Sequence, residues 1–354
     1  MNRRHFLLAG SAMLATTPTW AAEDSVPDLL KSQTGSGGGI VAAMLDQRGA
    51  RIVPSAPLDG DTVFEIASLT KILTALLLAD MVQSGDVALD DPVAKYLPAH
   101  VGVPDYDGHA ITLRHLATYT AGLPAFPDDL PKLDKAKPFP DYSIDQLYAA
   151  LANTKLSYAP GEHYRYSNFG YGLLGHVLSR VAGMRYEDLV VARVCAPLGM
   201  DSTRITLTPS MRARRAPGHS DRSDAVASWV QPPAFEAASA FFSTANDLLK
   251  FLAAAMGQRS SSLAPAFAAL LQPRRSMKST HYPGMNIAAG WFVFDDHGDE
   301  LVWKNGDTLG FTSFMGYSAK SQTGVILLAN GEYPGLTDLG WHLLNADFPL
   351  QKPG

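Results

Sequence analysis

The alternation of hydrophobic and polar positions predicts strands near both ends of the chain. An apolar run at 40–45 and a second run at 50–54 flank the polar segment Asp46 to Gly49, a pattern typical of a β-hairpin. Short strand-like runs return late, each bounded by Gly, Asp or Asn, at 287–294, 301–304, 312–317 and 324–329. These late runs indicate an antiparallel sheet.

Between these strands the pattern changes to helical periods. From Ser68 to Gln83 the chain has no Pro or Gly, and apolar residues recur at helical intervals, which predicts a buried helix that Ser68 opens. Further helices are expected at 112–118 and 170–181, separated by a proline-rich loop at 124–140. The fold class expected is therefore α+β, with a sheet built from 22–95 and 236–354 and a mostly helical subdomain inserted at 96–235.

The first residues indicate export. Arg3 and Arg4 precede an apolar stretch that runs from Phe6 to about Ala15, and small residues at Thr19 and Ala21 suit cleavage after Ala21, so 1–21 reads as a signal peptide. The paired arginines fit the twin-arginine or the general secretory route. No later run reaches the ~18 uncharged apolar residues that a membrane span needs, so a periplasmic mature chain without an integral membrane segment is expected.

Composition narrows the classes of partner. The chain has 354 residues, 46% hydrophobic and 18% charged, with a formal net charge of −5 and no cluster of basic residues, so nucleic acid is not an expected partner. Cys195 is the only cysteine and is expected to be a buried hydrophobe. The ten histidines show no metal-ligand spacing, so neither a metal nor another cofactor is expected. Oligomeric state is left open.

Three short motifs carry candidate chemistry. Ser68 and Lys71 form Ser-x-x-Lys, which places a hydroxyl and an amine on one helix face, and a serine becomes nucleophilic when a nearby base takes its proton. Burial in an apolar run lowers the pKa of a lysine and suits Lys71 to that task. Tyr166-Ser167-Asn168 could relay protons, and Lys304-Asn305-Gly306, taken as an edge strand, offers a cation beside an open backbone. Each motif alone is common by chance.

Together and in this order, the motifs resemble those of class C β-lactamases and low-molecular-weight penicillin-binding proteins. Further matching segments cover nearly the whole mature chain: Phe64 to Ala67, Leu116 to Pro124, Tyr158 to Gly161, Pro197 to Met200 and Ser243 to Leu248. In particular, the chain resembles AmpH-type D-alanyl-D-alanine carboxypeptidase/endopeptidases through Ile66 to Lys71, Asp91 to Tyr96 and Ile111 to Leu113. The resemblance implies the β-lactamase/transpeptidase-like fold and a serine hydrolase.

Residue roles follow from the resemblance. It implies that Ser68 is the nucleophile, that Lys71 and Tyr166 transfer protons, and that Asn168, Lys304, Asn305 and Gly306 bind substrate. The backbone N–H groups of Ser68 and Asp307 would form the oxyanion hole.

Two departures from the family pattern concern recognition of a substrate carboxylate. Asn305 stands where the family usually has threonine, and Glu332 stands where class C enzymes usually have asparagine, so an ionised Glu332 would repel an anionic substrate terminus.

Four functions remain open at this point. The leading one is a peptidase that cleaves D-alanyl peptides of peptidoglycan through an acyl-enzyme, with weak β-lactam hydrolysis as a side reaction. The others are a class C β-lactamase, a carboxylesterase or D-amino-acid amidase on the same fold, and a non-catalytic binding protein, against which the intact Ser68, Lys71 and Tyr166 argue.

Overall fold

The computed structural model describes residues 26–33, 38–131, 141–220, 225–226, 231–272, 274–278, 284–296, 299–348 and 350. The expected signal peptide and the second half of the proline-rich loop, 132–140, lie outside these residues. Among the described residues, none of the helices combines the length and the apolar character needed to cross a bilayer.

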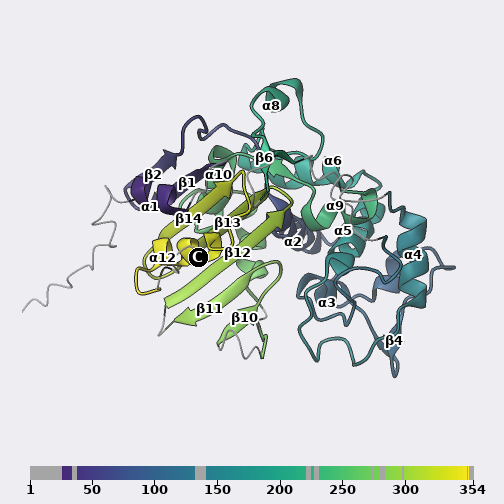
Figure 1. The fold of residues 1–354 in the computed structure, drawn as a ribbon. Coiled ribbons are helices and arrows are strands. Elements are labelled where there is room, and N and C mark those ends of the chain that lie inside the picture. The colour runs from purple at the N-terminus through teal and green to yellow at the C-terminus, as the bar shows by residue number, and fades with distance from the viewer. Residues whose placement is uncertain are drawn as a thin grey trace, which may run out of the picture.

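An eight-stranded antiparallel sheet forms one side of the molecule, in the order β2-β1-β14-β13-β12-β11-β10-β9 (Figure 1). The strands are β1 (Ile40–Asp46), β2 (Gly49–Pro54), β9 (Arg275–Ser276), β10 (Met285–Ile287), β11 (Phe292–Asp296), β12 (Asp299–Thr308), β13 (Phe311–Ser318) and β14 (Thr323–Ala329). β1 pairs with β2 in the predicted hairpin and with β14 on its other side, so both ends of the chain build the sheet. This confirms the expected fold class.

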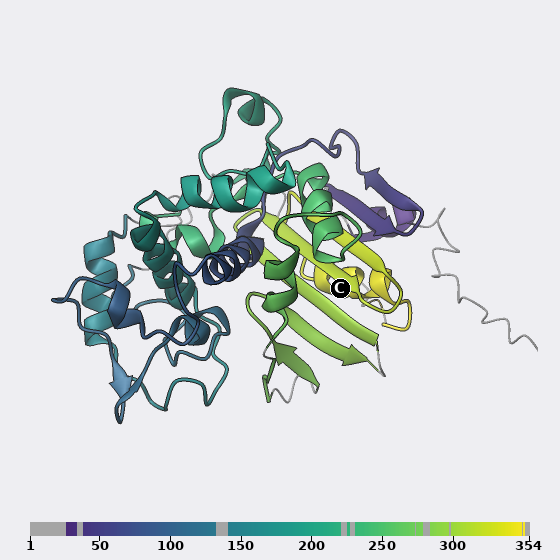
Figure 2. The ribbon, with the colours of Figure 1, turned by 180° about the vertical axis from the view of Figure 1, so that it is seen from behind.

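Helices cover both faces of the sheet and fill the rest of the molecule (Figures 1 and 2). α12 packs on β13 and β14 from one side, while α10 packs on β1 and β14 from the other. The helices are α1 (Val26–Gln33), α2 (Thr70–Gln83), α3 (Leu113–Ala117), α4 (Ile144–Asn153), α5 (Asn168–Ala182), α6 (Tyr186–Val190), α7 (Ala196–Leu198), α8 (Pro209–Ala213), α9 (Glu236–Ser239), α10 (Ala245–Ala255), α11 (Ala264–Leu270) and α12 (Leu336–Leu344).

Short elements complete the chain. There are 3-10 turns at η2 (Ala67–Leu69), η3 (Val93–Tyr96) and η5 (Pro233–Phe235), and a π-helical turn at η4 (Val191–Cys195). Three small ribbons pair β3 (Phe64–Glu65) with β8 (Phe242–Ser243), β4 (Asp105–Tyr106) with β5 (His109–Ala110), and β6 (Gly218–His219) with β7 (Ala225–Val226). The subdomain boundaries expected near 95 and 235 stay a prediction.

α2 lies between the sheet and the helical region and contacts α5, α9 and α11. Nearly all of its side chains are buried, which explains why its apolar residues leave no polar face. The predicted helix does not start at Ser68, however. Ser68 lies in η2, and α2 begins at Thr70, so Lys71 occupies the first turn of α2.

The strand that carries Lys304 also differs from the prediction, because β12 is an interior strand. It pairs with β13 from Leu301 to Thr308, but its pairing with β11 runs only from Asp299 to Trp303. The expected strand at 287–294 is divided into β10 and β11, since the intervening segment turns toward α2 and the Gly290 N–H donates to the Ala117 carbonyl at 3.2 Å. Within the described residues, the last part of β12 therefore keeps one edge open.

Candidate active site

The strained turn η2 presents the Ser68 hydroxyl. Ala67 has a φ of +49°, a left-handed conformation that costs a non-glycine residue of order 1 kcal/mol and persists only where the surroundings impose it. Both neighbours of Ser68 are buried, whereas Ser68 itself is half-exposed. The Ser313 hydroxyl of β13 donates to the Ile66 carbonyl at 2.9 Å and fixes the turn to the sheet. The turn therefore exposes the Ser68 hydroxyl, while the residues on either side of it are buried in the core.

Lys71 is fully buried and reaches three acceptors. Its Nζ donates to the Asn168 Oδ1 at 2.7 Å, to the Ala238 carbonyl at 2.8 Å and to the Ser68 Oγ at 3.1 Å. Burial, reinforced by the positive charge of Lys304, holds the pKa of Lys71 well below its ordinary value. Lys71 therefore loses its proton more readily than an ordinary lysine does.

The geometry gives the neutral amine of Lys71 the orientation of a base. A neutral lysine has two N–H donors and one lone pair. The two shorter contacts end on an amide oxygen and a backbone carbonyl, which only accept hydrogen bonds, so both donors are used there. The lone pair is left facing Ser68 Oγ, where it can take the hydroxyl proton.

Tyr166 approaches Ser68 from the other side. Its hydroxyl donates to the Ser68 Oγ at 2.8 Å, and burial raises its pKa above the ordinary value, so Tyr166 keeps its proton at rest. The Lys71 Nζ lies 4.8 Å from the centroid of the Tyr166 ring. A protonated tyrosine in this place can pass a proton toward a leaving group, while Lys71 receives the one that Ser68 loses.

Lys304 lies beside the same tyrosine. Its side chain is 2% exposed, with Nζ 5.2 Å from the centroid of the Tyr166 ring and 4.9 Å from that of Phe292. Burial lowers the pKa of Lys304 to about 7, opposed by the negative charge of Asp307. Its Nζ donates to the Asn305 carbonyl at 2.9 Å. Lys304 therefore contributes a partial and shielded positive charge.

Gly306 brings β12 directly against the nucleophile. A Cβ added at Gly306 would lie 2.6 Å from the Ser68 nitrogen and 2.9 Å from the Ile66 carbonyl oxygen. Because no larger residue fits, the glycine allows β12 to approach the turn, and Asp307 follows it on the open edge of the strand. The two backbone N–H groups predicted to form an oxyanion hole, those of Ser68 and Asp307, therefore belong to segments in direct contact.

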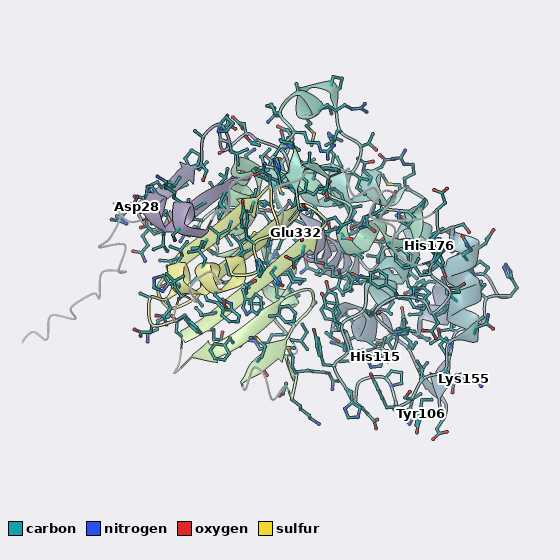
Figure 3. All side chains as sticks on the ribbon, in the orientation of Figure 1. Asp28, Tyr106, His115, Lys155, His176 and Glu332 are labelled. Carbon is teal, nitrogen blue, oxygen red and sulfur yellow. The ribbon has the colours of Figure 1, made fainter. Side chains whose placement is uncertain are left out.

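The remaining residues considered for substrate binding lie on three different segments. Asn168 begins α5, after the N-cap Ser167, and its side chain contacts Lys71. Asn305 is half-buried on β12. Glu332 is half-buried in the loop after β14, at the end of the sheet toward which β12 runs (Figure 3). The substrate-binding roles of these residues stay predictions.

Sequence reasoning did not assign a role to Tyr119. This residue is 1% exposed, has a φ of +55°, and stacks on Tyr166 with ring centroids 4.9 Å apart and planes 23° apart. Its carbonyl accepts from the Arg165 N–H at 2.8 Å, which fixes the backbone next to Tyr166. Tyr171, whose ring lies 5.0 Å from that of Tyr119, completes the aromatic wall beside Lys71. The sequence contained one signal for such a role, because Tyr119 lies within Leu116 to Pro124, a segment that resembles the family.

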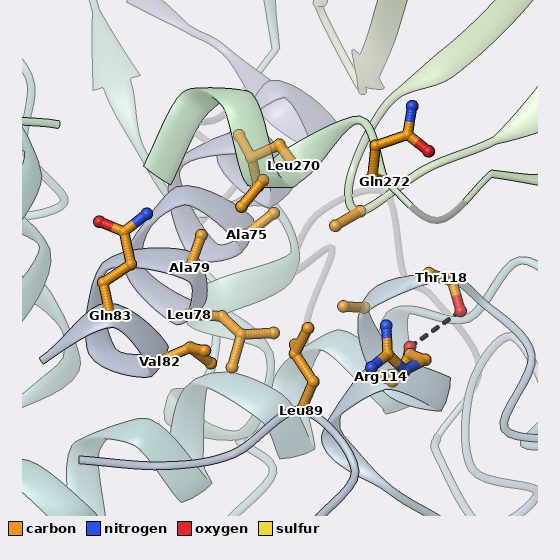
Figure 4. Close-up of a pocket in the computed structure, with 13 residues that line it drawn as sticks. Ala75, Leu78, Ala79, Val82, Gln83, Leu89, Arg114, Thr118, Leu270 and Gln272 are labelled. Carbon is orange, nitrogen blue, oxygen red and sulfur yellow. Dashed lines mark hydrogen bonds between the residues drawn. The ribbon is translucent and has the colours of Figure 1, made fainter. Parts of the chain in front are cut away.

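An apolar pocket and the single cysteine lie outside the candidate active site. A small apolar pocket runs along α2 beyond Lys71, with Ala75, Leu78 and Ala79 on one wall and Leu270 opposite (Figure 4). Ser68, Tyr166 and Lys304 do not line it. Within the described part of the chain, no three His, Cys, Asp or Glu side chains converge as a metal site would require. Cys195 is buried, as expected.

Known proteins resemble this chain in sequence and in fold. Residues 27–347 match the family model described as Beta-lactamase. The D-alanyl-D-alanine-carboxypeptidase/endopeptidase AmpH of Escherichia coli K12 is 37% identical over 155 residues, which cover 44% of this chain and only 40% of that protein. A Beta-lactamase of the same organism is 28% identical over 334 residues, 84% of this chain and 83% of that protein. A solved class C β-lactamase superposes with a TM-score of 0.80 at 22% identity, over 94% of this chain and 99% of that one.

Proposed function

Because this chain belongs to the Beta-lactamase family of serine hydrolases, we propose that it is a penicillin-binding D-alanyl-D-alanine carboxypeptidase/endopeptidase that acts on peptidoglycan peptides through an acyl-enzyme on Ser68. One observation carries the proposal: Ser68 Oγ lies within hydrogen-bond distance of both the Lys71 amine and the Tyr166 hydroxyl. The match to AmpH supports the peptidase reading. The arginine pair and apolar segment before Ala21 support action in the periplasm after export.

The proposed reaction has two steps. Lys71 takes the hydroxyl proton while Ser68 Oγ forms a bond to the D-alanyl carbonyl carbon, and the developing oxyanion is held by the N–H groups of Ser68 and Asp307. The carbon–nitrogen bond then breaks, and the leaving amine receives a proton from Tyr166, which recovers one from Lys71. Water next attacks the acyl carbon of the ester, and the bond between that carbon and Ser68 Oγ breaks to release the acid. The proton that water loses passes through the same groups to Ser68 Oγ.

The test is covalent labelling with a fluorescent penicillin, together with release of D-alanine from a peptide ending in D-alanyl-D-alanine or cleavage of a cross-linked peptide. Ser68-dependent, long-lived labelling and peptide cleavage would support the proposal, with Ser68→Ala as the negative control. Ser68-dependent ester hydrolysis without labelling or peptide cleavage would contradict it and favour the esterase or amidase reading.

A class C β-lactamase is the second candidate, because the E. coli Beta-lactamase aligns over 83% of its own length. The two functions share the acylation step and differ in how fast water removes the acyl group. Rapid turnover of nitrocefin with loss of label within seconds would identify the β-lactamase.

A further inference from the structure

Ser313 lies between the two segments that carry the predicted oxyanion donors. It is a fully buried residue of β13, and it pairs with Gly306 of β12. Its hydroxyl donates to the Ile66 carbonyl at 2.9 Å and to the Gly306 carbonyl at 3.2 Å, so the two carbonyls share its one proton. One buried side chain therefore connects the turn that carries Ser68 with the strand that carries Asp307.

On the β12 side, the Ser313 hydroxyl acts on the peptide group that contains the Asp307 N–H. The carbonyl of Gly306 and the N–H of Asp307 belong to one planar trans peptide group and point in opposite directions. With its carbonyl directed to Ser313 of β13, this group directs its N–H away from β13, to the side that β11 leaves uncovered. The hydrogen bond to the carbonyl also polarises the peptide group, because hydrogen bonds in a chain strengthen one another. Ser313 therefore fixes the direction of the Asp307 N–H and strengthens it as a donor.

On the other side, the same hydroxyl holds the turn that presents the Ser68 N–H. The Ile66 carbonyl accepts the Leu69 N–H at 3.1 Å as well as the Ser313 hydroxyl, so this oxygen both closes the turn and joins it to the sheet. The turn contains Ala67, whose positive φ persists only where the surroundings impose it. The separation of the two oxyanion donors therefore depends on contacts that meet at Ser313.

We propose that Ser313 is a positioning residue of the acylation reaction, which fixes the separation and direction of the Ser68 and Asp307 N–H groups toward the developing oxyanion. This inference rests on the acyl-enzyme at Ser68 proposed above, and it applies to any acyl donor, because esters, amides and β-lactams all form an oxyanion when Ser68 attacks. Donors stabilise that charge best when they need not move as it develops, so a loosened pair is less effective even though both N–H groups remain. Because Ser313 is fully buried, it acts through these two backbone groups.

The experiment measures the acylation rate and the strength of the oxyanion contacts in Ser313→Ala. A chromogenic ester and a fluorescent penicillin give the rate constant of Ser68 acylation. Infrared spectroscopy of the acyl-enzyme, with an isotopic label in its ester carbonyl, gives the stretching frequency of that carbonyl. We expect acylation to slow by about tenfold, less than the loss of about a hundred- to a thousandfold that follows removal of a whole donor. The carbonyl band should move to higher frequency, because weaker hydrogen bonds leave the carbonyl more double-bond character.

Two further variants separate positioning from stability. Ser313→Ala is expected to fold, because the Ile66 carbonyl keeps the Leu69 N–H as a donor. Ser318→Ala is the matched control, since Ser318 is a second fully buried serine of β13 and donates to the Asp299 carboxylate at the last residue of the strand. It should lower the unfolding temperature but leave the acylation rate and the carbonyl band unchanged. Ser313→Cys places a weaker donor at the same position, so its band should lie between those of wild type and Ser313→Ala.

The outcomes for Ser313 and for the proposed function can be told apart. An unshifted carbonyl band in a folded Ser313→Ala protein, or an equal shift in Ser318→Ala, would overturn the role of Ser313 while Ser68-dependent peptide cleavage still supported the peptidase. Acylation of Ser68 by the ester without penicillin labelling or peptide cleavage would contradict the peptidase, and the band of the ester-derived acyl-enzyme would still decide the role of Ser313. Ester hydrolysis that survives Ser68→Ala would refute both.

Discussion

Replacing Gly306 by alanine tests whether acylation of Ser68 requires the close contact between β12 and the turn that carries Ser68. The added Cβ would lie 2.6 Å from the Ser68 nitrogen, 2.9 Å from the Ile66 oxygen and 2.9 Å from the Ser313 hydroxyl. Ordinary contacts of a Cβ begin near 3.4 Å, so β12 and the turn must separate by about 0.8 Å. Two of the three contacts are backbone atoms, which cannot rotate away as a side chain could.

That separation has a predictable cost in rate. Misplacement of a reacting group by about 1 Å costs about a hundredfold, and loss of one oxyanion donor costs about a hundred- to a thousandfold. We therefore expect Gly306→Ala to lower the second-order rate of Ser68 acylation by at least about a hundredfold. Overpacking at this contact is expected to destabilise the fold by about 1–3 kcal/mol.

The assay pairs acylation kinetics with thermal unfolding. A fluorescent penicillin gives the rate of labelling, and a chromogenic ester gives kcat/KM, both at a temperature well below the unfolding midpoint. Gly85→Ala is the matched control, because Gly85 has a φ of +77° but no atom within 4 Å of an added Cβ, so stability falls while the site is untouched. Acylation within about threefold of wild type in a folded Gly306→Ala protein would refute the reasoning.

Three further predictions address the buried groups. Lys71→Arg keeps a permanent positive charge and cannot accept a proton, so the rate of Ser68 acylation should fall by about a thousandfold at every pH. An acylation rate within about tenfold of wild type would show that Lys71 is not the base. Tyr119→Asn tolerates the positive φ but removes the ring stacked on Tyr166, so kcat should fall by about tenfold or more. Tyr119→Phe keeps the ring and should stay near the wild-type kcat. Equal kcat values for the two variants would show that Tyr119 does not position Tyr166. Burial raises the pKa of Glu236 from 4.5 to about 7, so its ionisation destabilises the folded state by up to about 3 kcal/mol above pH 7 and by nothing below pH 4.5. Glu236→Gln should therefore raise the free energy of unfolding at pH 8 but not at pH 4.5, measured by denaturant titration, and an equal gain at both pH values would contradict this cause.

Periodicity was a sufficient guide to several elements of the fold. The hairpin of β1 and β2, the buried helix α2 and the late strands follow from local patterns, because the alternation of apolar residues reports which face of an element is buried. The order of the three motifs likewise indicated Ser68, Lys71, Tyr166 and Lys304 as one group. Their distances depend on contacts between segments far apart in the chain, which no local pattern encodes.

The sequence by itself thus determined the fold class, the candidate nucleophile and its basic partner. Only the tertiary structure decided that Ser68 lies in a strained turn rather than in the helix, that Tyr119 supports Tyr166, and that Lys304 is enclosed while Asp307 is exposed. The physical reason lies in long-range packing. The segment before β11 turns away to dock on α2 through Gly290, so β11 pairs with β12 only as far as Trp303 and leaves Asp307 on an open edge beside the nucleophile.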